Sequence, residues 1–329
     1  MKVIVIGGTG NISTSVVQLL LEQGHDVTVF NRGVTQEVPK DVRLIKGDRN
    51  NREDFEAKMK KDKYDAVIDM ISFSREDAES SYRAFRDVGH FVQCSSIATY
   101  GKDFDWLPVT EDHPSKATTP YGVGKDEADR FLLEAYYREG FPVTILKPSM
   151  TYATRIQRQI SWDFGWLDRI RKGKPVIICD GNIIVQFLHS EDAAKGFVGV
   201  IGKKHCLGQM YNLVETGYTT WGIEHKAAMK VIGREVELVT VPNETLMAID
   251  PERFSPCDEF FSFNTYFSGE KIHRDVPEFR PTIDLELGET KALDYLDRNG
   301  LIPDSDQETW EDEIISLQKS VAQNYPKAG

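Results

Sequence analysis

The chain has 329 residues, 40% of them hydrophobic, and a formal net charge of −12. Its length supplies enough core for one large domain or two modest ones, and its acidic balance argues against broad binding to nucleic-acid phosphates or to an anionic membrane surface. No apolar run approaches the roughly 18 residues of a membrane span.

The first half of the chain alternates predicted strands with predicted helices. Apolar runs predict strands at 2–6, 27–30, 42–45, 66–70, 90–94 and 143–146. Helical spacing follows residue 12, and further helices are expected at 75–87 and 121–138. This alternation implies right-handed crossovers and a parallel sheet covered on both faces, so we expect an α/β chain with a doubly wound Rossmann sheet. Ligands of such sheets bind outside the carboxyl ends of the strands.

The second half is less regular. A strand is expected at 176–179, helices are expected after 187–192, at 220–232 and at 285–297, and the aromatic-rich segment 243–270 reads as a loop. We expect this half to form a smaller substrate-binding lobe. The predicted domains are therefore 1–150 for the nucleotide and 151–329 for the substrate, with a soft boundary and further chain crossings.

A glycine turn lies between the first strand and the first helix. Gly7, Gly10 and Ser13 occupy the three key positions of the G-x-x-G-x-x-G pattern, with serine small enough to replace the third glycine. Glycine allows a pyrophosphate to approach the helix N-terminus, whose free N–H groups and dipole favour an anion. We therefore expect an NAD(P) site that includes Gly7, Gly10, Asn11 and Ile12.

The residues after the second and third strands bear on which dinucleotide binds. Asn31 and Arg32 stand where an NAD enzyme usually carries a carboxylate for the ribose hydroxyls, so Arg32 is placed to face a 2′-phosphate and NADP is slightly preferred over NAD. The alternative is a solvent-facing arginine in a turn. Asp48, followed by Arg49, is placed to lie near the adenine amino group, with a turn aspartate as the alternative.

Tyr121 and Lys125 are four residues apart on a predicted helix and therefore share one face. A free tyrosine has a pKa of about 10, too high for a base at neutral pH. A cation roughly 4 Å away, at an effective dielectric of about 20, supplies about 4 kcal/mol, or nearly three pKa units. We expect Tyr121 to be an acid/base that Lys125 activates, with Ser96 holding a substrate oxygen. A chance surface pair is the alternative.

With these residues in view, the chain resembles the extended short-chain dehydrogenase/reductase superfamily, specifically the NAD-dependent epimerase/dehydratase family. The resemblance covers nearly the whole chain. It implies hydride transfer in which Ser96 holds the substrate hydroxyl or carbonyl, Tyr121 is the acid/base and Lys125 contacts the nicotinamide ribose. It also implies that residues 70–72, beginning with Met70, border the cofactor and that Pro148 passes near the nicotinamide, and it favours a homodimer. The motifs that carry it are 7–13, 47–48, 95–101, Tyr121 with Lys125, 147–148, 187–189 with Asp192, and 279–281.

Three stretches, 29–33, 47–50 and 66–70, also resemble the branch that includes chloroplast stem-loop RNA-binding proteins. That branch supplies one rival function, an RNA-associated protein, and a dinucleotide-sensing protein without turnover is another. The acidic charge and the intact Ser96, Tyr121 and Lys125 favour chemistry, so nucleic acid is not expected as a partner.

The resemblance breaks at two positions that concern the substrate. Sugar-nucleotide epimerases commonly carry Asn and Arg where this chain has Met150 and Val185, and neither replacement can hold a diphosphate. The expected substrate is therefore a sugar-like or other polyhydroxylated small molecule rather than an ordinary sugar nucleotide.

Other conspicuous residues are given weaker interpretations. His189 reads as a packing residue, Trp162 and Trp166 as either pocket or core, and no metal site is expected. The four cysteines show no paired spacing, which favours reduced thiols in a cytoplasmic protein. A solvated helix face is expected to account for four arginines better than an anionic substrate does: Arg155, Arg158, Arg169 and Arg171.

Overall fold

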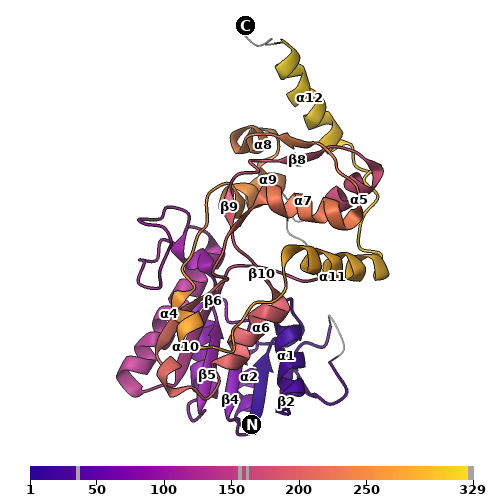
Figure 1. Ribbon diagram of the computed structural model, residues 1–329. Coiled ribbons are helices and arrows are strands. Elements are labelled where there is room, and N and C mark those ends of the chain that lie inside the picture. The colour runs from indigo at the N-terminus through magenta and orange to yellow at the C-terminus, as the bar shows by residue number, and fades with distance from the viewer. Residues whose placement is uncertain (35–37, 155–157, 161–162, 325–329) are drawn as a thin grey trace. The chain divides into compact units, whose positions relative to one another are not determined.

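A computed structural model describes residues 1–34, 38–154, 158–160 and 163–324 (Figure 1). The chain forms two compact units. The first comprises Met1–Thr151, Phe187–Gly217 and Tyr266–Thr282, and the second comprises Tyr152–Gln186, Tyr218–Thr265 and Ile283–Gly329. The chain thus passes repeatedly between the units. That residues 1–150 serve the nucleotide and 151–329 the substrate stays a prediction.

The first unit is built on a seven-stranded parallel sheet, which confirms the predicted Rossmann fold (Figure 1). The strand order is β11-β6-β5-β4-β1-β2-β3. From the central pair β4-β1, strand numbers increase toward both edges of the sheet, through β2 and β3 on one side and through β5, β6 and β11 on the other. This is the order expected for a doubly wound sheet. The strands are β1 (Lys2–Ile6), β2 (Asp26–Asn31), β3 (Arg43–Lys46), β4 (Ala66–Asp69), β5 (His90–Cys94), β6 (Val143–Pro148) and β11 (Gln209–Leu213).

Helices cover both faces of this sheet, because alternate strand residues point to opposite sides. Val3 and Val5 pack into one core with α1 (Ser13–Glu22) and α6 (Ser190–Gly199). Ile4 and Ile6 pack into the other core with three helices. These are α2 (Arg52–Met59), α3 (Arg75–Ala84) and α4 (Pro120–Glu139).

The sequence at both ends of α4 explains where this helix begins and ends. The Thr119 hydroxyl accepts a hydrogen bond from the Gly122 N–H at 3.1 Å, and Pro120 occupies the first turn. Gly140 ends the helix with a φ of +75°. A Cβ on Gly122 would lie 2.6 Å from the Ala98 carbonyl oxygen, so glycine allows the loop after β5 to approach the first turn closely.

Short elements complete the first unit. They are the 3-10 turns η1 (Ile97–Tyr100) and η2 (Lys204–Cys206), the strand β10 (Phe187–His189) and the helix α10 (Glu270–Asp275); β7 (Met150–Tyr152) stands where the chain first leaves the unit. His189 is buried, and its Nδ1 accepts a hydrogen bond from the Glu191 N–H at the start of α6. That contact gives His189 a structural role.

The second unit combines two small sheets with helices. β8 (Val176–Ile178) pairs in parallel with β13 (Leu238–Thr240), and β9 (Ile184–Val185) pairs antiparallel to β12 (Thr219–Thr220). The helices are α5 (Gly165–Lys172), α7 (Trp221–Ile232), α8 (Asn243–Ile249), α9 (Pro251–Pro256), α11 (Leu285–Arg298) and α12 (Trp310–Asn324), and a π-helical turn η3 covers Cys257–Phe261.

The prediction of a loop over 243–270 was wrong. α8, α9 and the π-helical turn occupy most of its length. Asp250 caps α9 by accepting the Arg253 N–H at 3.0 Å, and Phe254 and Phe261 are buried. The aromatic residues therefore belong to a helical core, which sequence periodicity did not reveal because each helix is too short to repeat a pattern.

Two residue-level expectations concern buried side chains of the second unit. Cys179 and Cys257 face each other with Cα atoms 7.7 Å apart, wider than a disulfide spans, so reduced thiols stay a prediction. Trp166 is fully buried in a hydrophobic core, which removes it as a pocket residue. Trp162 and Arg155 lie outside the described residues.

The expected solvated arginine face was wrong for two of its members. Arg158 and Arg169 are buried, and they bind Glu311 and Asp312 on α12 at 2.6 and 2.5 Å. Arg171 makes two hydrogen bonds to Asp297. Their guanidinium groups thus fasten helices of the second unit together.

Candidate functional site

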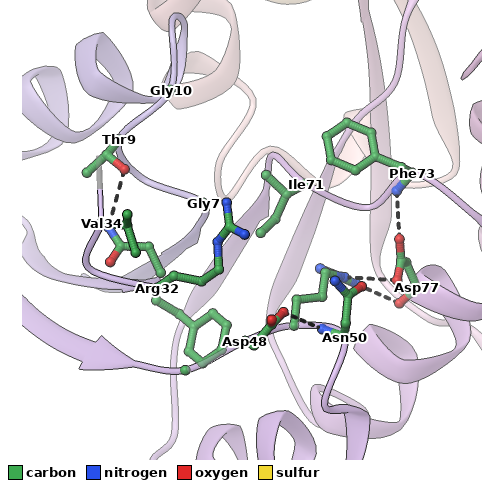
Figure 2. A pocket seen from close by; sticks show the side chains of 14 residues that line it. Gly7, Thr9, Gly10, Arg32, Val34, Asp48, Asn50, Ile71, Phe73 and Asp77 are labelled. Atoms are coloured by element: carbon green, nitrogen blue, oxygen red, sulfur yellow. Dashed lines mark hydrogen bonds and ion pairs between the residues drawn. The ribbon is translucent and has the colours of Figure 1, made fainter. Parts of the chain in front are cut away.

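A cavity of about 360 Å³ opens in the first unit where the loops after β1, β2, β3 and β4 meet (Figure 2). This is the edge of the sheet at which ligands of Rossmann folds bind. Six predicted cofactor residues line the cavity: Gly7, Gly10, Asn31, Arg32, Asp48 and Arg49.

The glycine turn after β1 leaves backbone N–H groups available at the start of α1. Gly7 has a φ of +82°, and a Cβ on it would lie 2.5 Å from the Ile71 side chain. No side chain caps the first turn of α1, whose N-cap is Ile12. An uncapped helix N-terminus beside a glycine turn suits a pyrophosphate. The turn is also braced from within, because the Gly10 N–H donates to the buried Ser13 hydroxyl at 2.7 Å.

The loop after β2 presents positive charge to the cavity. Asn31 stabilises this loop by accepting the Gly33 N–H at 2.8 Å and by donating to the Thr9 hydroxyl at 3.3 Å. Arg32 is exposed and extends into the cavity (Figure 2), and in the described part of the chain its guanidinium has no hydrogen-bond or ion-pair partner. The exposed Lys46 side chain lies over the same turn, since a Cβ on Gly33 would be 3.0 Å from its Cε.

The loop after β3 places Asp48 and Arg49, both predicted cofactor residues, in different surroundings. Asp48 lines the cavity and also accepts the Asn50 N–H at 2.9 Å, so it is at once a turn aspartate and available to a ligand. Arg49 lies at the cavity wall, but its buried guanidinium binds Asp69 at 3.0 and 2.8 Å. It also donates to Ser81 and to the Asp77 carbonyl, both at 2.7 Å. Arg49 thus binds protein partners through Nη1 and Nη2, and its contact with a cofactor stays a prediction.

Five other predicted cofactor residues lie outside the lining of this cavity: Asn11, Ile12, Met70, Lys125 and Pro148. Sequence reasoning in turn missed most of the apolar wall and one acid, which are Phe30, Val34, Phe73 and Asp77. Phe73 carried a detectable signal, since an aromatic residue just after a predicted strand is unusual in a surface loop, and it is 48% exposed.

The structure brings the three predicted catalytic residues together at the end of β5. Ser96 precedes η1 and accepts the Ala98 N–H at 3.1 Å, and its hydroxyl lies close enough to that of Tyr121 to lower the pKa of the tyrosine. Lys125 is 1% exposed and donates to the Cys94 carbonyl oxygen at 2.6 Å. Its Nζ lies 4.5 Å from the centre of the Phe73 ring and 5.9 Å from that of Tyr121.

The electrostatics at Tyr121 differ from the expectation. Although 41% of the residue is exposed, burial around its hydroxyl raises the pKa of Tyr121 to about 12, and the nearby Ser96 hydroxyl acts in the opposite direction. Burial also lowers the pKa of Lys125. The expected lowering of the tyrosine pKa is absent because the ammonium donates to Cys94 and lies closer to Phe73. In this state Tyr121 holds its proton at neutral pH.

The described residues contain neither a candidate metal cluster nor a candidate membrane-spanning helix. Their histidine, cysteine and acidic side chains nowhere gather in threes that could hold a metal ion. None of the helices placed by the structure has the length and apolar character of a membrane span.

A family model described as the NAD dependent epimerase/dehydratase family matches residues 3–213. Among curated proteins, 2′-dehydrokanamycin reductase of Streptomyces kanamyceticus is 25% identical over 74% of this chain and 70% of its own length. Chloroplast stem-loop binding protein of 41 kDa b from Arabidopsis thaliana is 24% identical over 96% of this chain and 84% of its own length. A UDP-glucose 4-epimerase of Corynebacterium glutamicum is 31% identical, but over only 45% of this chain and 50% of its own length.

Solved structures of epimerases share the fold. UDP-glucose 4-epimerase from Thermotoga maritima, with UDP-glucose, superposes with a TM-score of 0.73 at 19% identity, over 91% of this chain and 99% of its own. UDP-glucuronic acid 4-epimerase from Bacillus cereus, with UDP-glucuronic acid and NAD, gives 0.71 at 19% identity, over 91% of this chain and all of its own. At these identities the likeness concerns the fold.

Proposed function

Because the chain belongs to the NAD-dependent epimerase/dehydratase family, we propose that it is an NAD(P)-dependent oxidoreductase or epimerase for a sugar-like or other polyhydroxylated small molecule. The observation that carries this proposal is the meeting of Ser96, Tyr121 and Lys125 at the end of β5, in the same unit as a cavity suited to a dinucleotide. These are the groups that carbonyl–alcohol interconversion needs: a proton carrier, a hydrogen-bond donor to the oxygen, and a cation.

The residues have separate roles in the proposed reaction. When bound, NAD(P) supplies or accepts the hydride. In the direction of reduction, the Tyr121 O–H bond breaks and its proton passes to the substrate oxygen, while the Ser96 hydroxyl donates a hydrogen bond to that oxygen. Solvent returns the proton to the phenolate, and the Lys125 ammonium would contact the nicotinamide ribose. Epimerisation uses the same step twice, with the intermediate turned in between.

The protonation state of Tyr121 favours reduction as the direction from which to search for a substrate. With its pKa raised to about 12 by burial, Tyr121 is ready to donate a proton at neutral pH, whereas oxidation requires its rare phenolate. The likeness to a relative named for the reduction of 2′-dehydrokanamycin supports the same direction.

The proposed substrate lacks a nucleoside diphosphate. Met150 and Val185 offer no charged group to one, and Arg158 is occupied by Glu311. Calorimetry of the cofactor-loaded protein with UDP-, GDP- and dTDP-sugars tests this point. Binding at about micromolar Kd that disappears when the diphosphate is removed would show that the substrate is a sugar nucleotide after all.

NADP is proposed to bind slightly better than NAD, since Arg32 and Lys46 bring two cations to the loop after β2. Location in the cytoplasm and assembly as a homodimer are proposed from the family likeness alone.

Activity is tested by following the reduced nicotinamide while the protein is offered ketones, sugar acids and aminoglycoside ketones. We expect turnover of at least one, and Tyr121→Phe should lower it by at least about 100-fold because the proton-donating oxygen is lost. Tyr137→Phe is the matched control, because Tyr137 lies on the same helix and is 75% exposed. Normal turnover by Tyr121→Phe would refute the mechanism.

RNA association is the second candidate, favoured by the likeness to the chloroplast stem-loop binding protein over nearly the whole chain. A dinucleotide sensor without turnover is the third. Native mass spectrometry distinguishes them in part: copurified NAD(P) supports an enzyme or a sensor, and copurified RNA supports the second candidate.

A further inference from the structure

Asp129 is a buried carboxylate on the helix that carries Tyr121 and Lys125. The three residues recur at intervals of four along α4, so they share one face of the helix. Asp129 is 2% exposed. Its Oδ2 accepts a hydrogen bond from the Ser95 hydroxyl at 2.5 Å and lies 3.6 Å from the Nζ of Lys147 on β6.

These contacts hold the segment that contains Ser96 at both ends. Ser95 directly precedes Ser96 and is bound to Asp129, and Thr99 follows in η1 and accepts a hydrogen bond from Lys147 at 2.9 Å. One turn earlier on α4, Lys125 binds the Cys94 carbonyl oxygen. Two side chains of α4 therefore hold consecutive residues at the end of β5, and the helix that carries Tyr121 sets the position of Ser96.

Asp129 is also placed between two buried cations. Lys125 and Lys147 are 1% and 3% exposed, and a buried ammonium tends to lose its proton unless a negative charge compensates it. Burial lowers the pKa of Lys125, Cys94, Asp129 and Asp69 act against that effect, and Arg49 adds to it. Burial raises the pKa of Asp129, and Lys147, Ser95 and Lys125 oppose that rise. The Cys94 thiol is neutral at physiological pH, because burial raises its pKa to about 11. Arg49 binds both carboxylate oxygens of Asp69.

A purely structural role does not account for this arrangement well. The second carboxylate oxygen of Asp129, Oδ1, is buried and has no hydrogen-bond partner among the described residues. A buried carboxylate with an unsatisfied oxygen costs free energy, and apolar packing at such a site is often at least as stable.

We propose that Asp129, acting with Lys147 and Ser95, is a positioning residue that holds the Ser96 hydroxyl against Tyr121 and keeps Lys125 protonated. The Asp129 carboxylate supplies both the negative charge that favours the Lys125 ammonium and the acceptor that holds Ser95. This inference rests on the proposed function for its catalytic meaning, but its electrostatic part is measurable without any substrate.

The test is a pH titration of the lysine side chains by NMR of protein labelled with 13C at lysine Cε. Lys125→Met and Lys147→Met identify the two signals. Asp129→Asn, which removes the charge and keeps the size, should move the Lys125 titration to lower pH. Glu134→Gln is the matched control, since it makes the same change on the exposed side of α4, where Glu134 pairs with Arg138. An unmoved Lys125 titration in folded Asp129→Asn protein overturns the proposal.

A second variant guards against failure of Asp129→Asn to fold. Lys147→Met leaves Asp129 with one cation instead of two, so the Lys125 titration should move to higher pH, opposite to the first shift. A shift to lower pH, or none, in this variant also contradicts the proposal. Because the NMR readout needs no turnover, a protein that shows both shifts but reduces no substrate refutes the proposed function and leaves this inference standing.

Turnover tests the positioning itself, once a substrate is known. Ser95→Ala keeps both lysines and Asp129 but removes the hydrogen bond that holds the segment, and it should lower kcat by about 10- to 100-fold with KM little changed. An unchanged kcat would show that Ser96 is held without Asp129.

Discussion

At the scale of single residues, the protonation of Tyr121 determines how the proposed enzyme responds to pH. The pKa of Tyr121 is raised to about 12 because the hydroxyl is buried. At any pH below that value, the phenolate fraction grows about tenfold for each unit by which the pH increases. Reduction uses the protonated phenol, which is fully populated at neutral pH, and oxidation uses the phenolate.

We therefore expect different pH dependences in the two directions. The rate of alcohol oxidation should rise steadily through alkaline pH, and the rate of carbonyl reduction should stay flat across neutral pH. Initial rates in both directions at saturating cofactor measure this. An oxidation rate that levels off near neutral pH would show that the pKa of Tyr121 is low in the loaded enzyme.

Arg32 is the residue on which discrimination between the two dinucleotides is expected to depend. Its guanidinium extends into the cavity and has no partner among the described residues, so a 2′-phosphate would gain a charge-assisted hydrogen bond worth roughly 1.5–3 kcal/mol. Arg32→Ala should weaken NADPH binding by roughly 10- to 100-fold and leave NADH binding nearly unchanged. Fluorescence titration of both cofactors measures the effect, with Arg86→Ala as a distant surface control. A strong NAD preference that Arg32→Ala does not alter would contradict it.

At the scale of elements, the turn between β1 and α1 requires glycine for two separable reasons. Gly7 has a φ of +82° and would also place a Cβ 2.5 Å from Ile71. Gly140, at the end of α4, has a φ of +75° with nothing within 4 Å of a Cβ. Substitution of Gly140 by alanine therefore measures the cost of the left-handed backbone alone, without a steric clash.

Gly7→Ala should lower the free energy of unfolding more than Gly140→Ala does. The left-handed backbone costs each variant about 1–2 kcal/mol, and overpacking against Ile71 adds about 1–3 kcal/mol to the first. Urea unfolding of the two variants and the wild type gives both values. Equal losses of unfolding free energy in the two variants would show that the loop containing Ile71 moves aside at no energetic cost.

The contact between α7 and α11 in the second unit contains two buried acids, Glu224 and Glu289. Burial raises the pKa of Glu289 well above its ordinary value of 4.5, and Glu224 raises it further. The folded state therefore holds a proton that the unfolded chain releases above that value. The stability contributed by Glu289 is fully present in acid and is lost as pH rises from about 4.5 through the folded-state pKa.

Glu289→Gln should consequently raise the free energy of unfolding at neutral pH, and the gain should shrink toward acid pH. Denaturant unfolding at a series of pH values measures this difference between variant and wild type. Glu286→Gln, on the same helix but exposed, is the control. A variant that is less stable than wild type at neutral pH would mean that the Glu289 carboxylate is ionised and satisfied.

The elements that the sequence predicted well are those whose pattern is local. Apolar runs located β1 to β6, because buried parallel strands are apolar throughout. β11 was missed because Gln209 and Asn212 interrupt it, and the Asn212 side chain is satisfied only in three dimensions, by Tyr100 and the Val109 carbonyl. The same limit applies to the site: residue types identified Arg49 and Lys125, but not that Asp69 and Cys94 would bind them.

At the scale of the whole molecule, the net charge of −12 opposes binding to a polyanion. Any RNA binding should be weak and should fall steeply as salt rises, because only local basic patches can contact phosphates. Filter binding of a stem-loop RNA at increasing salt measures this. Tight binding that persists at moderate salt would favour the RNA-associated function over the enzyme.

The interleaving of the two units has a consequence for the order in which a ribosome can complete this protein. β6 pairs with β5 on one side and with β11 on the other, and Ile272, Val276 and Phe279 fill the core beneath α1 and α6. A nascent chain released only as far as Thr151 would thus expose an unpaired strand edge and an open core. The first unit cannot finish folding while it is being made from the N-terminus. It must wait until residues of the other unit have emerged and its own last segment has followed them.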